Sequence, residues 1–443
     1  MGKYAIVFGY WSNIKYSVHV LVGALESYRS FEEVRVFLSS LDEIPKLIET
    51  LIGKYDRIAY FQTLLTTDLP STYSKLIQLN KRLKSLNVTS VGGGPHATGD
   101  PYGTILSLNF NYAFVGEVED SLNELLGLLF HGGDPTEVRG LAWFEGGRIR
   151  LNGRGQVKDL DRFPPFAPIH RLFNPIELTR GCIYACKYCQ VSYAFTANLR
   201  HRSVENVIKW SNYMFERGIK DLRFISPDVL SYGALGKEVN FSKLLELFEG
   251  LSKVREKGAK VYLGSFPSEV RPEKVSEDIA STLRRYVDND RIAIGAQTGS
   301  DSLLKAIGRG HTSEDVLNSV EALTKHGFKV DVDYIFGLPG ETDEDVQATL
   351  NHISRVLKLG GKAHVHTFIP LPGTPYALAE PGRISPEVKK KLLKLVGEGK
   401  AYGNWLRQEK LANEIKKLRE VGVILITPKR AYDLLSLKGF QVM

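Results

Sequence analysis

Three cysteines stand in one short run, Cys182, Cys186 and Cys189, and the rest of the chain has none. Their C-x3-C-x2-C spacing lets a single loop wrap around an inorganic cluster. Three thiolates leave one iron of a [4Fe–4S] cube without a protein ligand, and that open corner can do chemistry. Because the chain has three cysteines, a disulfide framework that pairs every cysteine is excluded, and so is a zinc site with four cysteine ligands. The alternative from the same residues is a zinc site that combines the three cysteines with His201.

The cysteine loop directly follows a predicted strand, and Gly181 permits the tight exit from that strand. From there, strands alternate with helices such as Val204–Arg217 and Ser242–Lys257. Six such units predict an open, partial (β/α)6 barrel whose functional loops lie at the carboxyl ends of the strands. The predicted strands are Ile176–Thr179, Asp221–Ile225, Lys260–Gly264, Arg291–Ala296, Lys329–Phe336 and Ala363–Phe368.

The N-terminal part of the chain also alternates strand and helix. Five short apolar or β-branched runs predict a doubly wound parallel sheet, whose ligands bind beyond the carboxyl ends of the strands. The predicted strands are Tyr4–Phe8, Val34–Leu38, Arg57–Phe61, Thr89–Gly92 and Tyr112–Val115. The predicted helices are Ser17–Tyr28, Ile44–Ile52, Ser71–Leu86, Tyr102–Leu108 and Ser121–Phe130.

Two further segments flank the barrel. Leu141–Phe144 and Arg148–Leu151 predict a hairpin, and Asp161–Pro168 a proline-stiffened linker. The tail from Ser385 to Met443 is predicted to be mainly helical, with a short strand at Val421–Ile426. We therefore divide this α/β chain into a doubly wound domain (1–135), a hairpin and linker (136–173), the partial barrel (174–384) and a helical region (385–443).

The composition is that of a globular protein, with 43% hydrophobic residues and no window of 18 apolar ones. The first residues run into a strand rather than a signal peptide, so we expect a cytoplasmic protein, where reducing conditions suit an oxygen-sensitive cluster. The net charge of +8 favours a solvated lysine-rich surface and leaves nucleic acid open as a partner. Few Cys and Met residues with abundant Lys, Glu and Arg are typical of a thermophile.

The cysteine loop, with an aromatic residue before its last cysteine, resembles the radical SAM superfamily over roughly residues 174–375. Arg291–Asp301 with Arg309–Thr312 is similar to the fourth-strand segment of the branch that contains methylthiotransferases and many cobalamin-dependent members. Asp333–Thr342 and His366–Pro375 resemble the fifth and sixth strand segments of that branch. The resemblance implies that the open iron chelates S-adenosylmethionine (SAM), and that a ferredoxin- or flavodoxin-like reductant serves the cluster.

The resemblance also implies a set of SAM-binding residues. Asp228 lies in Ser226-Pro-Asp228, where the family more often has Gly-Gly-Glu in contact with the SAM amino group. A carboxylate suits an ammonium group, although the same residue could cap a helix. Tyr188 could cover the cluster and touch adenine, or simply pack in the core. The predicted SAM residues are Tyr188, Asp228, Ser265, Glu269, Arg271 and Gln297.

The glycine-rich run Val91–Pro101 and the segment Phe114–Glu119 together resemble the cobalamin-binding domain found upstream of radical SAM barrels. Glycines let backbone N–H groups approach a phosphate. Many cobalamin proteins supply an axial histidine from a D-x-H-x-x-G run between the first strand and the first helix, where this chain has Phe8–Lys15. We therefore expect no histidine ligand on cobalt. For His96 we expect a role in the loop or at the nucleotide tail of cobalamin. The predicted cobalamin residues are Thr66, Gly93, Gly94, His96, Thr98, Gly116 and Glu117.

The resemblance implies a cobalamin-dependent radical SAM enzyme, namely a methyltransferase that acts at an unactivated carbon through a 5′-deoxyadenosyl radical and methylcobalamin. Three alternatives remain: a rearrangement or ring-forming enzyme that uses cobalamin without net methylation, a radical SAM enzyme whose N-terminal domain no longer binds cobalamin, and a regulator with an inert barrel. Methylthiolation of RNA or protein would need a second cluster with its own cysteines, and residues 1–181 contain none.

Overall fold

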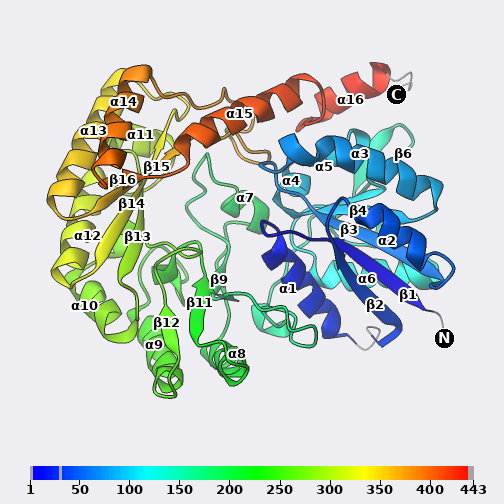
Figure 1. Cartoon of the computed structure of the whole chain (residues 1–443), viewed down its shortest axis with the longest axis horizontal. Coiled ribbons are helices and arrows are strands. Elements are labelled where there is room, and N and C mark those ends of the chain that lie inside the picture. Colours follow the sequence, from blue (N-terminus) through cyan, green and yellow to red (C-terminus); the bar gives the residue numbers. More distant parts are fainter. Residues whose placement is uncertain (1–2, 29–31, 438–443) are drawn as a thin grey trace.

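The N-terminal half of the protein is built on one seven-stranded sheet (Figure 1). The structure is a computed structural model and describes residues 3–28 and 32–437. Five parallel strands in the order β2-β1-β3-β4-β5 confirm the predicted doubly wound sheet, and the predicted hairpin extends it as the antiparallel strands β6 and β7. The strands are β1 (Tyr4–Gly9), β2 (Val34–Ser39), β3 (Arg57–Thr63), β4 (Thr89–Gly93), β5 (Tyr112–Phe114), β6 (Leu141–Glu145) and β7 (Arg148–Leu151).

Helices cover both faces of this sheet. Ile6 and Phe8 of β1 pack in one apolar cluster with residues of α1 and α6, whereas Ala5 and Val7 pack in another with residues of α2 and α3. β1 is therefore buried on both sides, as a continuous apolar run in a parallel sheet requires. The helices are α1 (Lys15–Glu26), α2 (Ile44–Leu51), α3 (Leu69–Ser85), α4 (Gly94–Gly99), α5 (Pro101–Leu106) and α6 (Glu119–His131).

The glycine-rich run after β4 forms the short helix α4. Gly94 has a φ of +86°, a value that favours glycine, and Pro95 follows in the first turn of α4. Asp100 then caps α5 by accepting a hydrogen bond of 2.8 Å from the backbone N–H of Gly103. The chain thus turns twice within a few residues at the carboxyl end of β4.

The second half is an open barrel. It consists of the sheets β12-β11-β8 and β13-β14-β15-β16. The segment 268–270 connects them through two isolated parallel bridges, Ser268 with Ser226 after β11 and Val270 with Ile294 of β13. The six predicted barrel strands are confirmed, the first of them as two short pieces. The strands are β8 (Ile176–Glu177), β9 (Thr179–Arg180), β10 (Arg200–His201), β11 (Asp221–Ile225), β12 (Lys260–Tyr262), β13 (Arg291–Gln297), β14 (Lys329–Phe336), β15 (Lys362–Thr367) and β16 (Ala401–Tyr402).

Helices enclose the barrel from outside (Figure 1). Capping boxes at Thr312 and Thr342 begin α12 and α13. In each box the threonine hydroxyl accepts from the backbone N–H of the aspartate three residues later, and the carboxylate of that aspartate accepts from the backbone N–H of the threonine. The helices are α7 (Val191–Phe195), α8 (Val204–Glu216), α9 (Phe241–Arg255), α10 (Glu277–Tyr286), α11 (Asp301–Ala306), α12 (Ser313–Lys325), α13 (Asp343–Lys358), α14 (Pro386–Gly397), α15 (Trp405–Glu420) and α16 (Pro428–Leu437).

The C-terminal region crosses from the barrel back to the N-terminal half (red in Figure 1), with α15 in contact with β15 and α3. The predicted strand Val421–Ile426 is wrong. Ile424 and Leu425 are buried as an apolar run would be, but the N–H groups of Leu425 and Ile426 bond the Asp100 carboxylate at 2.8 and 2.9 Å. A side chain, not a neighbouring strand, takes these donors. Within residues 3–28 and 32–437, no helix is long and apolar enough to cross a membrane.

Candidate functional site

The three cysteines lie on the loop between β9 and α7, at the mouth of the barrel, and none of them forms a disulfide. Gly181 begins this loop with a φ of +89°, and a Cβ atom there would clash with the carbonyl oxygen of Asn198. The hydroxyl of Ser192 ties the loop by donating to the carbonyl of Cys182 at 2.6 Å. The local geometry therefore forces all three sulfurs onto one compact turn.

The sulfurs form part of the wall of a cavity of about 400 Å³. Burial, with the other two thiols as neighbours, raises the pKa of the Cys189 thiol to about 12. Such a thiol ionises at neutral pH only where a metal ion replaces its proton. Three sulfurs on one wall of a cavity suit a cluster that keeps one iron open toward a ligand.

A buried cation accompanies the sulfurs. Nη1 of Arg309 lies 4.0 Å from Sγ of Cys186, and Nη2 donates to the carbonyl of Gly295 at 2.7 Å. Arg309 is 9% exposed, so its charge is poorly screened by water. It is placed to offset negative charge on thiolates. The sequence interpretation noted Arg309 within a strand motif but gave it no role.

Four of the six predicted SAM residues line the cavity, namely Tyr188, Glu269, Arg271 and Gln297. Arg271 stacks over the Tyr184 ring at 3.3 Å, and Gln297 has a φ of +73° beside an irregularity in the β13–β14 pairing. Burial and the adjacent Asp333 carboxylate raise the pKa of Glu269 to about 7. The barrel therefore brings polar groups from the ends of several strands to the sulfurs.

The other two predicted SAM residues do not line this cavity. Asp228 caps the short helix Val229–Ser231, accepts from the hydroxyl of Ser231 at 2.6 Å and pairs with Nζ of Lys274 at 2.8 Å. Ser265 Oγ accepts from Asn289 at 2.9 Å. In this structure the partners of both side chains are structural groups of the barrel.

The residues predicted to bind cobalamin follow the carboxyl ends of three neighbouring strands, β3, β4 and β5. His96 has no exposed surface, its Nδ1 lies 3.0 Å from Oγ1 of Thr66, and burial lowers its pKa. The hydroxyl of Thr98 accepts from the N–H of Gly116 at 3.0 Å. The imidazole of His96 is thus held within the domain by a neighbouring side chain. Helix α4, which carries His96, contacts α7, which follows the cysteine loop.

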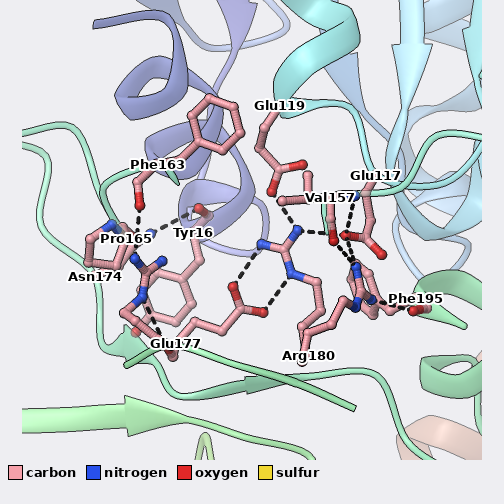
Figure 2. A network of polar contacts seen from close by, with 12 residues as sticks. Tyr16, Glu117, Glu119, Val157, Phe163, Pro165, Asn174, Glu177, Arg180 and Phe195 are labelled. Atoms are coloured by element: carbon pink, nitrogen blue, oxygen red, sulfur yellow. Dashed lines mark hydrogen bonds and ion pairs between the residues drawn. The ribbon is translucent and has the colours of Figure 1, made fainter. Parts of the chain in front are cut away.

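Glu117, predicted for cobalamin, takes part in a charge network between the two halves (Figure 2). Its Oε2 lies 3.0 Å from Nη1 of Arg180 and 2.7 Å from Nη1 of Arg200. Arg180 also pairs with Glu119 at 2.6 Å and with Glu177 at 2.7 Å. Arg180, Glu117 and Glu119 are buried. The strand that leads into the cysteine loop is thus bound electrostatically to the N-terminal domain.

Residues 176–353 match the family model of the radical SAM superfamily. The methyltransferase TsrM from Kitasatospora setae, solved with cobalamin and a [4Fe–4S] cluster, superposes with a TM-score of 0.65 at 15% identity, covering 86% of this chain and 75% of that one. The cobalamin-dependent radical enzyme OxsB, with aqua-cobalamin and SAM bound, gives a TM-score of 0.64 at 15% identity, covering 99% of this chain and 71% of that one.

The curated relatives are matched over a smaller share of their own length than these two structures are. A tRNA-2-methylthio-N(6)-dimethylallyladenosine synthase of Moorella thermoacetica is 32% identical over 229 residues, which is 50% of this chain and 48% of that protein. An uncharacterised methyltransferase of Pyrococcus horikoshii is 26% identical over 322 residues, 70% of this chain and 66% of that protein. The chain spans about half the length of the methylthio-forming relative.

The barrel, its cysteine loop and the family match together define a radical SAM domain, which implies a [4Fe–4S] cluster and SAM as cofactors. The match to the radical SAM superfamily covers the barrel, residues 176–353, and both halves of the chain are similar in fold to TsrM and OxsB.

Proposed function

We propose that this protein is a cobalamin-dependent radical SAM methyltransferase that acts at an unactivated carbon. The observation that carries the proposal is the placement of α4, at the sheet edge predicted for cobalamin, against α7, directly after the cysteine loop. The likeness in fold to TsrM and OxsB over most of the chain supports it. When bound, the cluster with SAM supplies a radical that removes hydrogen, and cobalamin supplies a methyl carrier.

The residues of the chain itself would hold the cofactors in position and balance their charge. Cys182, Cys186 and Cys189 would hold the cluster, and Arg309 would balance its negative charge. Tyr188, Glu269, Arg271 and Gln297 surround the cavity in which SAM would lie, with Asp228 and Ser265 as supports behind it. SAM and a substrate that fill this cavity would displace water from it, which would protect a reactive intermediate and fix the reacting groups.

The test uses the full chain, reconstituted anaerobically with iron and sulfide, with and without hydroxocobalamin. We expect corrin to stay with the protein through desalting and 5′-deoxyadenosine to form on addition of SAM and a reductant. A Cys186→Ala variant, which lacks one cluster ligand, should retain corrin and form no 5′-deoxyadenosine. Full cluster loading without corrin retention would contradict the cobalamin assignment alone.

An isotopic methyl label on SAM separates methyl transfer from the cobalamin-using rearrangement and ring-forming alternatives, since only methyl transfer carries the label into product. A methylthiotransferase function is favoured by the relative from Moorella. It is opposed by the cysteine count, because a second cluster would need ligands and all three cysteines belong to one loop.

A further inference from the structure

Three side chains with metal-binding atoms meet on two neighbouring strands of the barrel. Asp333 lies on β14, and His364 and His366 lie on β15. The strands pair in parallel with Asp333 opposite His364. Because side chains two residues apart on a strand point to the same face, the two imidazoles and the carboxylate share one side of the sheet.

The three ligand atoms converge. Oδ1 of Asp333 lies 2.7 Å from Nδ1 of His364 and 3.9 Å from Nε2 of His366, and the two nitrogens are 3.2 Å apart. Ligands bound at about 2.0 Å to a tetrahedral ion are about 3.3 Å from one another. A small ion at the centre of the three atoms therefore needs movements of only a few tenths of an ångström.

We propose that Asp333, His364 and His366 bind one divalent transition-metal ion of the Zn²⁺ or Fe²⁺ class. Two imidazoles and one carboxylate are a donor set that both ions accept, and three protein ligands leave coordination positions open. The site is separate from the cysteine loop in its donors, since it has no sulfur. It does not depend on the proposed methyl transfer.

Surrounding residues hold the ligands in place. The Tyr402 ring stacks on the His364 ring at 4.3 Å with an interplanar angle of 9°, and Gln408 contacts the ring of His366. Both histidine side chains are about a quarter exposed, so an ion has a path of entry. Such outer contacts orient metal ligands and tune their affinity.

Gln408 provides a specific test of this arrangement. Its Nε2 lies 3.1 Å from Nδ1 of His366, while its Oε1 accepts from the N–H of Thr367 at 3.0 Å. A metal ion on Nε2 of His366 puts the proton on Nδ1, which then needs an acceptor. The amide must turn to offer its oxygen, whereas a carboxylate at position 408 would accept from both N–H groups at once. Gln408→Glu should therefore tighten the binding of metal.

The position of the site gives the ion a role. Asp333 and His366 line the same cavity as Cys182, Cys186 and Cys189. An ion held here lies at the wall of that cavity, where its open positions can take an oxygen or nitrogen donor of the substrate. A carboxylate, phosphate or amide group on the substrate is the chemistry that such an ion would recognise.

The experiment titrates Zn²⁺ into the cluster-loaded full chain under anaerobic conditions, with zinc and iron measured by elemental analysis after desalting. We expect one zinc per chain with unchanged iron. His366→Gln and Asp333→Asn should each weaken zinc binding at least 100-fold without loss of iron, and Gln408→Glu should tighten it about 10-fold. Circular dichroism checks that each variant is folded.

A second arm replaces the three cysteines by alanine and repeats the titration without the cluster. Zinc should still bind once per chain, and His364→Gln in this background should abolish it. The proposal is overturned if the cluster-loaded chain takes up no zinc, if uptake survives both ligand variants, or if zinc binds only with loss of the cluster's own iron. Loss of zinc in the cysteine-free chain would likewise assign the metal to the cysteine loop.

Discussion

Nη1 of Arg180 lies 2.6 Å from Oε1 of Glu119, so the residue two positions before Cys182 is bound to the first turn of α6 in the N-terminal domain. Both side chains are buried, and Glu117 and Glu177 complete the contacts of the guanidinium (Figure 2). A buried ion pair adds little net stability compared with apolar packing, but removing one partner is costly. The network therefore fixes the cysteine loop against the N-terminal domain.

We predict that Arg180→Met lowers the free energy of unfolding by about 3–5 kcal/mol, because the carboxylates around it would stay buried without a counter-ion. Urea unfolding of the apoprotein measures this loss. Arg162→Met is the matched control, since the Arg162–Asp120 pair is largely exposed and should contribute about 0–1 kcal/mol. Equal losses in the two variants would show that burial of the Arg180 network does not increase the cost of removing its cation.

Arg309 is predicted to set the reduction potential of the bound cluster. Its charge lies 4.0 Å from Sγ of Cys186, and a reduced cluster carries one more negative charge than an oxidised one. Arg309→Met should make the potential more negative by about 60 mV or more, the value for a tenfold change in a one-electron equilibrium. Arg309→Lys keeps the charge and should lie closer to the unaltered protein.

An anaerobic redox titration followed by electron paramagnetic resonance gives these potentials, and iron content confirms equal loading of the variants. Identical potentials for Arg309→Met and the unaltered chain would contradict the electrostatic role. A change in iron content alone would indicate instead that Arg309 supports the fold of the loop.

The cysteine site could be predicted because its information is local: three residues within one turn carry the chemistry, and an apolar run marks the strand before them. The cluster of Asp333, His364 and His366 could not, because the convergence depends on the register of β14 against β15. The spacing of His364 and His366 indicates that both side chains point to the same face of a strand. Which third residue lies beside them depends on the register with the partner strand.

In the C-terminal tail, the local pattern predicted a strand that the structure does not form. Val421–Ile426 has the composition of a strand, yet the N–H groups of Leu425 and Ile426 bond the carboxylate of Asp100, which lies 325 residues from Leu425 in sequence. Glu117 was assigned to a ligand on family resemblance, whereas its carboxylate meets Arg180 and Arg200. In both places a long-range partner, not the local pattern, decides what the residue contacts.

His96 predicts a pH dependence of stability. Burial lowers its pKa in the folded protein below the usual 6.5, so the unfolded chain binds the proton more tightly. Stability from the neutral imidazole is complete above pH 6.5 and is lost as the pH falls below that value, with a slope of up to about 1.4 kcal/mol per pH unit.

The measurement compares the unfolding free energy of the unaltered apoprotein and of His96→Gln from pH 7.5 to pH 5. The variant should lose less stability over this range, because one proton uptake on unfolding is removed. His131→Gln, a change at a half-exposed histidine, controls for the substitution itself. A pH profile that His96→Gln leaves unchanged would contradict the role given to burial.

Glu269 and Asp228 differ in their access to the cavity, and only Glu269 is predicted to contact SAM directly. Glu269 lines the cavity, whereas Asp228 is 3% exposed and already paired with Lys274. Glu269→Ala should weaken SAM binding by roughly 10- to 150-fold, which corresponds to the loss of one charged hydrogen bond of about 1.5–3 kcal/mol. Calorimetric titration of the cluster-loaded chain with SAM measures this change.

Asp228→Asn is the companion variant. It should leave SAM affinity within about threefold of the unaltered value, yet lower the free energy of unfolding by about 3–5 kcal/mol, because the Lys274 ammonium would stay buried without its counter-ion. The reverse result, with affinity lost in Asp228→Asn and retained in Glu269→Ala, would place the SAM amino group at Asp228. In that case the short helix Val229–Ser231 must move when SAM binds, since its cap is the carboxylate in question.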